Sequence, residues 1–159
     1  METHTILKKL DRDSIILDIK GKNKKAILTT IVDHLAANKK IDNDCKKEIL
    51  KVLIQREDMG STAIGGYIAL PHARIDCIDD VAMCLAISSL GVGFDSLDQE
   101  PVHIIVLLLS NQKEAGMHLK MLAFLARMLR DKYFVQQIKA AKTQEDVLAL
   151  VSKQEQILR

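Results

Sequence analysis

The stretch His103-Ile104-Ile105-Val106-Leu107-Leu108-Leu109 decides the fold of this chain. Every position after the histidine is apolar, so both faces of the segment are hydrophobic if the backbone is extended. A strand of this kind is typical of the interior of a sheet that helices cover on both sides. We therefore expect it to be a central strand of the fold.

Segments of both secondary-structure types surround this strand along the chain. Those that read as further strands are 14–19, 67–70 and 81–88. Those in which apolar spacing predicts helices are 24–38, 114–130, 133–141 and 145–152. One more helix precedes residue 60, and Asp42 or Asn43 is expected to cap it. Strands interleaved with helices predict an α/β domain with a covered sheet.

Composition limits the class of protein. The chain has 159 residues, 48% of them hydrophobic, which suits one domain spanning 1–159 with a sizeable core. A net charge of +2 and an aromatic content of 3% argue against a nucleic-acid partner, since there is neither a basic arm nor a base-stacking platform. No apolar run is long enough to cross a bilayer, and the first residues carry no signal-peptide pattern. We expect a cytoplasmic protein that does not insert into membranes.

Neither a metal nor a cofactor is expected. The glycine pair Gly91 and Gly93 lacks the third glycine and the following helix of a dinucleotide site. Three cysteines without a C-x-x-C pair give no disulfide framework, in agreement with a reducing compartment. The histidines that have no companion at metal-ligand spacing, and that we take as structural or terminal residues, are His4, His34 and His103.

His72 is the first candidate for chemistry. It follows Pro71, which removes a backbone donor, so we expect sheet pairing to stop there and His72 to emerge in a loop. A neutral imidazole offers a nucleophilic nitrogen near pH 7, and Arg74 places a permanent cation nearby. This combination suits an incoming phosphoryl group, whose oxygens need positive charge. An ordinary loop histidine is the alternative interpretation.

His118 is the second candidate. The series His118, Leu122, Leu125 and Leu129 steps by four, three and four residues, which places the histidine on the inward side of a helix, in its first turn. A helix N-terminus favours anions, so His118 could donate a hydrogen bond to a bound phosphate. A core-edge histidine satisfied by a backbone carbonyl is the alternative.

Ser61 and Thr62 are the hydroxyl-bearing candidates. No G-x-S-x-G elbow surrounds them, so a nucleophilic role is not expected. The sequence leaves two uses for these hydroxyls, which are to bind an anion or to hold the loop.

Two stretches together resemble a known family. They are Arg56-Glu57-Asp58-Met59-Gly60-Ser61-Thr62-Ala63-Ile64-Gly65 and Ile68-Ala69-Leu70-Pro71-His72-Ala73. They resemble the active-site signature of phosphotransferase-system (PTS) enzyme IIA domains of the fructose, mannitol and nitrogen-regulatory type. The turn 93–96 and the helix start 118–122 follow in the order and rough spacing of that family. In its length as a free-standing chain, the protein resembles the nitrogen-regulatory branch more than a sugar-transport polypeptide.

The resemblance implies a fold, a role and a set of residues. The fold is a mixed sheet of about five strands with helices on both faces. His72 would accept a phosphoryl group on Nε2 from a phosphohistidine of HPr or an HPr-like protein, and would pass it on or signal by its phosphorylation state. Arg56 and His118 match the family's active-site arginine and second histidine, and the amides at Ala73 and Arg74 would add donors. The protein would then be a phosphoryl carrier and not a stand-alone turnover enzyme.

Three positions depart from the family pattern. Tyr67 stands where glycine is frequent, Arg74 where lysine is frequent, and the turn at Asp98-Gln99-Glu100 lacks the glycine that commonly follows the aspartate. None of these changes removes a group that the chemistry needs.

Three other functions stay open at this point. The chain could be a sugar-specific IIA component that passes the phosphoryl group to a IIB protein. It could also be a protein-binding regulator that is never phosphorylated, although Arg56, His72 and His118 are all present. A histidine-dependent hydrolase is disfavoured, because no activated hydroxyl, thiol or metal set accompanies His72. The sequence names neither the sugar, nor the regulated target, nor the oligomeric state.

Overall fold

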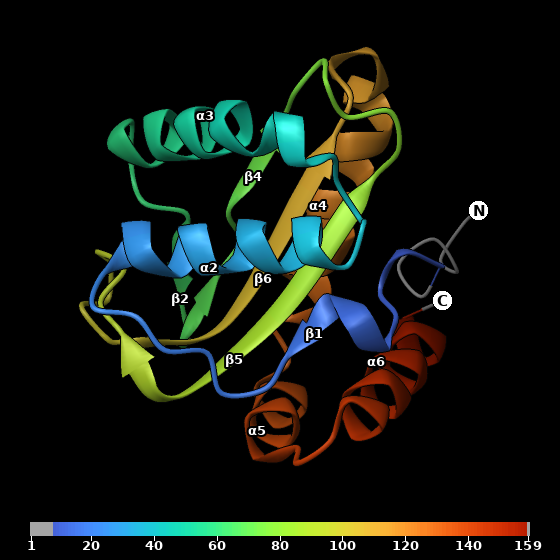
Figure 1. The fold of residues 1–159 in the computed structure, drawn as a ribbon. Coiled ribbons are helices and arrows are strands. Elements are labelled where there is room, and N and C mark those ends of the chain that lie inside the picture. The colour runs from blue at the N-terminus through green and yellow to red at the C-terminus, as the bar shows by residue number, and fades with distance from the viewer. Residues whose placement is uncertain (1–7, 159) are drawn as a thin grey trace.

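A computed structural model describes residues 8–158 and shows one mixed sheet with helices on both sides (Figure 1). The strands are β1 (Ile15–Ile16), β2 (Ala63–Gly65), β3 (Ile68–Ala69), β4 (His72–Arg74), β5 (Ala82–Val92) and β6 (Val102–Ser110). Five of them follow the order β1-β5-β6-β3-β2, and β4 also pairs with β6. β6 is antiparallel to β5 and parallel to both β3 and β4. The predicted α/β class and covered mixed sheet are confirmed.

Helices form a layer on each face of the sheet, as Figure 1 shows. They are α2 (Lys24–Ala37), α3 (Lys46–Asp58), α4 (Ala115–Met128), α5 (Lys132–Ala140) and α6 (Gln144–Leu158). One buried cluster joins α2 and α3 to the sheet, and a second joins α4, α5 and α6 to its other face. The two layers explain why so few polar residues interrupt the strands between them.

The central strand β6 divides its side chains between these two cores. Ile105, Leu107 and Leu109 pack into the α2 and α3 cluster. Ile104, Val106 and Leu108 pack into the α4–α6 cluster. All six are almost fully buried. Since successive side chains of a strand point to opposite faces, this alternation confirms the two-sided burial predicted from the sequence.

The N-termini of two helices differ. The Oγ1 of Thr143 accepts a hydrogen bond from the amide of Asp146 at 3.0 Å and so caps α6. The prediction for α3 was wrong, because neither Asp42 nor Asn43 caps it. A single 3-10 turn at Asn43–Cys45 lies between Asp42 and the helix, and no side-chain cap bond forms there. A short 3-10 turn before a helix satisfies its first amides in another way.

The segment around Pro71 corrects a second prediction. His72 does not lie in a loop, because β4 begins at this residue and pairs with β6 in the register His72 to Leu108. Proline cannot donate to a ladder, but its carbonyl accepts a hydrogen bond from the amide of Leu108 at 3.0 Å. The proline therefore separates β3 from β4 and leaves both strands on the same edge of β6.

None of the helices in residues 8–158 combines the length and the hydropathy that a membrane crossing requires.

Candidate functional site

The register of β4 decides which way its side chains face. His72 lies opposite Leu108, and Arg74 lies opposite Ser110. Residues paired in a parallel ladder project from the same face, and Leu108 packs into the α4–α6 core. His72, Arg74 and Ser110 therefore point towards α4, whereas Ala73 packs into the opposite core.

The imidazole of His72 is held through one ring nitrogen. Its Nδ1 lies 2.8 Å from the main-chain carbonyl oxygen of Leu70. A carbonyl can only accept a hydrogen bond, so Nδ1 carries the hydrogen and donates it. In the neutral ring, Nε2 then has a free lone pair. The half-buried ring thus offers Nε2 as a nucleophile.

His118 meets this ring from the first turn of α4. The two ring centroids are 5.6 Å apart, with an angle of 55° between the planes. His118 is only 4% exposed, and its Nδ1 lies 2.5 Å from the Oγ of the fully buried Ser110. Burial, the nearby His72 when it is protonated, and the positive charge of Arg74 together lower the pKa of His118 to about 4. His118 is therefore neutral near pH 7.

The two histidines line a hollow of about 480 Å³ between α3, β4 and the start of α4. Its other predicted site residues are Arg56, Ala73 and Arg74. Nη1 of Arg56 donates a hydrogen bond to the carbonyl oxygen of Gly60 at 2.8 Å, which holds the guanidinium at the end of α3. Two guanidinium groups and two imidazoles make this hollow suited to an anion.

Ser61 and Thr62 do not line this hollow. The hydroxyl of Ser61 donates to the carbonyl oxygen of Phe94, and that of Thr62 donates to the carboxylate of Glu57. Of the two uses considered from the sequence, the structure therefore has these hydroxyls holding the loop.

Sequence reasoning missed Glu57, which is 7% exposed and organises this loop. Its carboxylate accepts a hydrogen bond from the amide of Thr62 at 3.1 Å and pairs with Nζ of Lys24 at 3.2 Å. One buried carboxylate thus joins the start of α2, the end of α3 and the approach to β2. The sequence signal that could have identified Glu57 was its charge near the end of an amphipathic helix.

Ser110 was also missed. It is the last residue of β6 and the first polar one after the apolar run. That position, eight residues before His118, was a signal that sequence reasoning could have used, because a strand end and the following helix start often face each other.

The remaining histidines have other partners. Nε2 of His34 lies 2.7 Å from the carbonyl oxygen of Asp13, and Nδ1 of His103 lies 2.7 Å from that of Ser88. His4 lies outside the described residues. Between residues 8 and 158, no three His, Cys, Asp or Glu side chains are grouped so that they could hold a metal ion.

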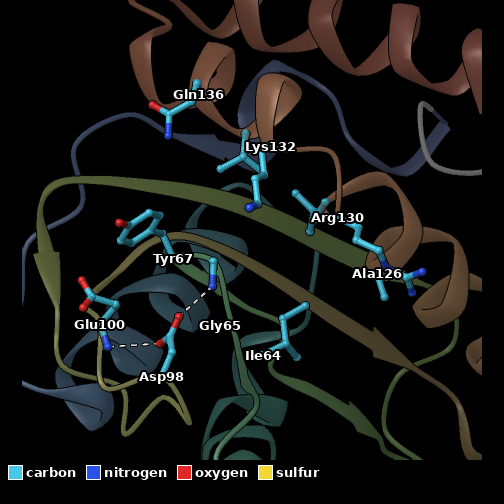
Figure 2. A pocket seen from close by; sticks show the side chains of 12 residues that line it. Ile64, Gly65, Tyr67, Asp98, Glu100, Ala126, Arg130, Lys132 and Gln136 are labelled. Atoms are coloured by element: carbon cyan, nitrogen blue, oxygen red, sulfur yellow. Dashed lines mark hydrogen bonds between the residues drawn. The ribbon is translucent and has the colours of Figure 1, made fainter.

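A larger hollow, of about 880 Å³, lies elsewhere and contains none of the predicted site residues. Figure 2 shows Tyr67 and Asp98 on one side of it and Arg130 and Lys132 on the other. Its size alone gives no reason to prefer it, because no histidine lines it. The smaller hollow contains both imidazoles and is therefore the better candidate site.

Two departures from the family pattern keep a glycine-like backbone. Tyr67 has a φ of +71° and Gln99 a φ of +61°, values that glycine adopts more easily than other residues. The Tyr67 ring packs against the ring of His103, with 5.7 Å between the centroids. Nζ of Lys139 lies over the Tyr67 ring, 4.7 Å from its centroid. Both residues therefore adopt a left-handed backbone without being glycine.

Comparison with known proteins agrees with this fold. The chain belongs to the family described as "Phosphoenolpyruvate-dependent sugar phosphotransferase system, EIIA 2", whose model matches residues 8–154.

Its relatives include both regulatory and sugar-specific proteins. A nitrogen regulatory protein of Bradyrhizobium diazoefficiens is 27% identical over 140 residues, which are 88% of this chain and 90% of the relative. The PTS system fructose-specific EIIABC component of Bacillus subtilis is 28% identical over 145 residues, 91% of this chain but 22% of that longer protein. The family resemblance seen in the sequence is thus confirmed.

Solved structures show the same fold. The nitrogen regulatory protein IIA-Ntr from Neisseria meningitidis superposes with a TM-score of 0.84 at 27% identity, covering 92% of this chain and 98% of that one. The complex of enzyme IIA-Mtl with phosphorylated IIB-Mtl from Escherichia coli gives a TM-score of 0.78 at 18% identity, covering 91% of this chain and 98% of that one.

Proposed function

We propose that this protein is a phosphohistidine carrier that accepts a phosphoryl group on Nε2 of His72 from an HPr-like phosphohistidine protein. We further propose that it acts as one domain in the cytoplasm and serves regulation, as in the nitrogen branch of the PTS. One observation carries the proposal. Nδ1 of His72 donates a hydrogen bond to the Leu70 carbonyl oxygen. Nε2 is therefore the free nitrogen of a ring that faces His118.

Transfer requires the exchange of one phosphorus–nitrogen bond for another. The lone pair on Nε2 of His72 attacks phosphorus, and the bond to the donor's imidazole breaks as the new bond forms. The bonding electrons stay with the donor's ring nitrogen. Because such transfers pass through a loose transition state, positioning and electrostatic stabilisation supply most of the catalysis, and no bound metal is required in principle.

The surrounding groups supply those two contributions. The Leu70 carbonyl fixes the angle of the nucleophile's ring. Arg56 and Arg74 line the same hollow and bring positive charge to the phosphoryl oxygens. His118, neutral near pH 7, can donate a hydrogen bond without repelling an attacking imidazole. The open side of the hollow leaves His72 half-buried, so that a donor protein can reach it.

Phosphorylation of the purified protein tests this proposal. Incubation with phosphoenolpyruvate, enzyme I and HPr should add the mass of one phosphoryl group, in an acid-labile linkage. His72→Ala should abolish the label, and His34→Ala, which changes a histidine outside the hollow, should retain it. A label that survives His72→Ala would place the acceptor elsewhere, and ³¹P–¹⁵N coupling to Nδ1 instead of Nε2 would contradict the assigned atom.

The alternative function is that of a sugar-specific IIA component, which the similarity to the fructose-specific relative favours. The two functions differ in the fate of the phosphoryl group once His72 carries it. Onward transfer of this group to a IIB protein would support sugar uptake. Binding to a target protein that changes between the phosphorylated and free forms, without onward transfer, would support regulation.

A further inference from the structure

We propose that Ser110 is a positioning residue that holds His118 in the tautomer with hydrogen on Nε2, so that this hydrogen can be donated to a phosphoryl group on His72. This inference rests on the proposed function and extends its site by one residue. Ser110 contacts the second histidine and does not touch the reacting atoms.

The geometry places the hydroxyl where it can select a tautomer. Ser110 Oγ lies 2.5 Å from Nδ1 of His118, and Ser110 is fully buried. Ser110 is the last residue of β6, and its carbonyl accepts a hydrogen bond from the amide of Ile75 at 2.8 Å. The backbone that carries the hydroxyl is therefore fixed by the sheet, and the ring must adjust to it.

The hydroxyl's own hydrogen decides the direction of the bond. If Nδ1 of His118 donated to Ser110, the buried hydroxyl hydrogen would need a second acceptor. His118 Nδ1 is the one partner found for this hydroxyl among residues 8–158. A buried donor without an acceptor costs about 1–3 kcal/mol. Donation from Ser110 to Nδ1 satisfies both groups and leaves the hydrogen of the neutral ring on Nε2.

The two imidazoles are then complementary. Nδ1 of His72 donates to a carbonyl, so its Nε2 has a lone pair. Nδ1 of His118 accepts from a hydroxyl, so its Nε2 has a hydrogen. With ring centroids 5.6 Å apart, one ring can bind phosphorus while the other donates to a phosphoryl oxygen. The opposite tautomer of His118 would turn a lone pair towards that anion.

Nitrogen NMR of the unphosphorylated protein tests the tautomer without any phosphoryl donor. In ¹⁵N-labelled wild type near pH 7, His118 should show a protonated Nε2 and a bare Nδ1. Ser110→Ala should move both nitrogens towards averaged shifts, and Ser110→Thr, which keeps a hydroxyl, should restore them. Ser88→Ala is the matched control, because Ser88 is also a buried strand serine and its hydroxyl accepts from Gly91. A wild-type His118 protonated on Nδ1 would overturn the proposal by itself.

Transfer kinetics test whether Ser110 acts through His118. Ser110→Ala should slow transfer from phosphorylated HPr about fivefold, the value of one net hydrogen bond. In a His118→Ala background the same substitution should cause no further slowing. An equal slowing in both backgrounds would mean that Ser110 acts on folding or packing and would refute its positioning role. Wild-type protein that accepts no phosphoryl group would refute the proposed function instead and leave the NMR result as it stands.

Discussion

The two histidines of the hollow are held by different kinds of group. A main-chain carbonyl, that of Leu70, fixes the half-buried His72 on a strand. A side-chain hydroxyl, that of Ser110, contacts the buried His118 at the start of a helix. A carbonyl cannot be removed by substitution and cannot donate, whereas a hydroxyl can be exchanged and can act in either direction. The nucleophile is thus set by the backbone, and its neighbour by one replaceable residue.

The largest test of this contrast replaces each ring in turn. His72→Ala should abolish phosphoryl acceptance, because it removes the atom that forms the bond. His118→Ala should leave acceptance in place and slow it by about 10²–10³-fold, the usual cost of losing one preorganised donor. Rapid-quench measurement of transfer from phosphorylated HPr gives both values. Equal loss in the two variants would erase the distinction between nucleophile and donor.

The second test is the pH dependence of stability. Because the folded pKa of His118 is about 4, below its ordinary value of 6.5, the unfolded chain takes up a proton that the folded chain refuses. The contribution of neutral His118 to the free energy of unfolding is present above pH 6.5. It is lost as the pH falls towards 4, by up to about 3 kcal/mol. Urea unfolding between pH 7 and 4.5 measures it.

His118→Gln is the control for that measurement, since glutamine keeps polar atoms but does not titrate. The stability advantage of wild type over this variant should shrink as the pH falls through the window. A constant difference across the window would contradict the lowered pKa.

A third, smaller effect is expected when His72 is phosphorylated. In the free protein the positive charge of Arg74, and of His72 when it is protonated, helps to lower the pKa of His118. A phosphoryl group adds negative charge beside the same ring, so the pKa of His118 should rise, by about one to two units. NMR titration of the phosphorylated and free forms checks this, and an unchanged pKa would place the phosphoryl group out of reach of His118.

The smallest effect should come from a substitution that lies away from both histidines and from the groups that hold them. Gln99 has a φ of +61°, so Gln99→Gly relieves backbone strain and should stabilise the fold by up to about 1 kcal/mol. Transfer rates should not change, because Gln99 does not line the hollow. Thermal unfolding and the transfer assay measure the two quantities, and slower transfer would show that this turn influences the site.

The features that sequence could predict are those with local or periodic causes. Two-sided hydrophobicity from Ile104 to Leu109 identified the central strand, and apolar spacing identified the helices, because burial imposes those periods. The three residues Arg56, His72 and His118 were found through chemistry and family resemblance, and the fold brings them to one hollow.

The features that sequence could not predict depend on distant pairing. Pro71 indicates the end of a strand locally, and only the position of Leu108 reveals that its carbonyl continues the ladder. The same limit applies to Ser110, whose contact with His118 depends on how α4 returns over β6. Glu57 reads as an exposed helix residue until Lys24 and Thr62 surround it. Each case requires two segments to be placed in three dimensions.

The larger hollow beside Tyr67 has a practical consequence for inhibitor discovery. A screen that ranks cavities by size would prefer it to the hollow that holds the histidines, since it is almost twice as large. Compounds bound there would contact Arg130 and Lys132 but neither imidazole. Binding assays alone would therefore select compounds that have no effect on phosphoryl transfer. A transfer assay is needed from the first round of screening.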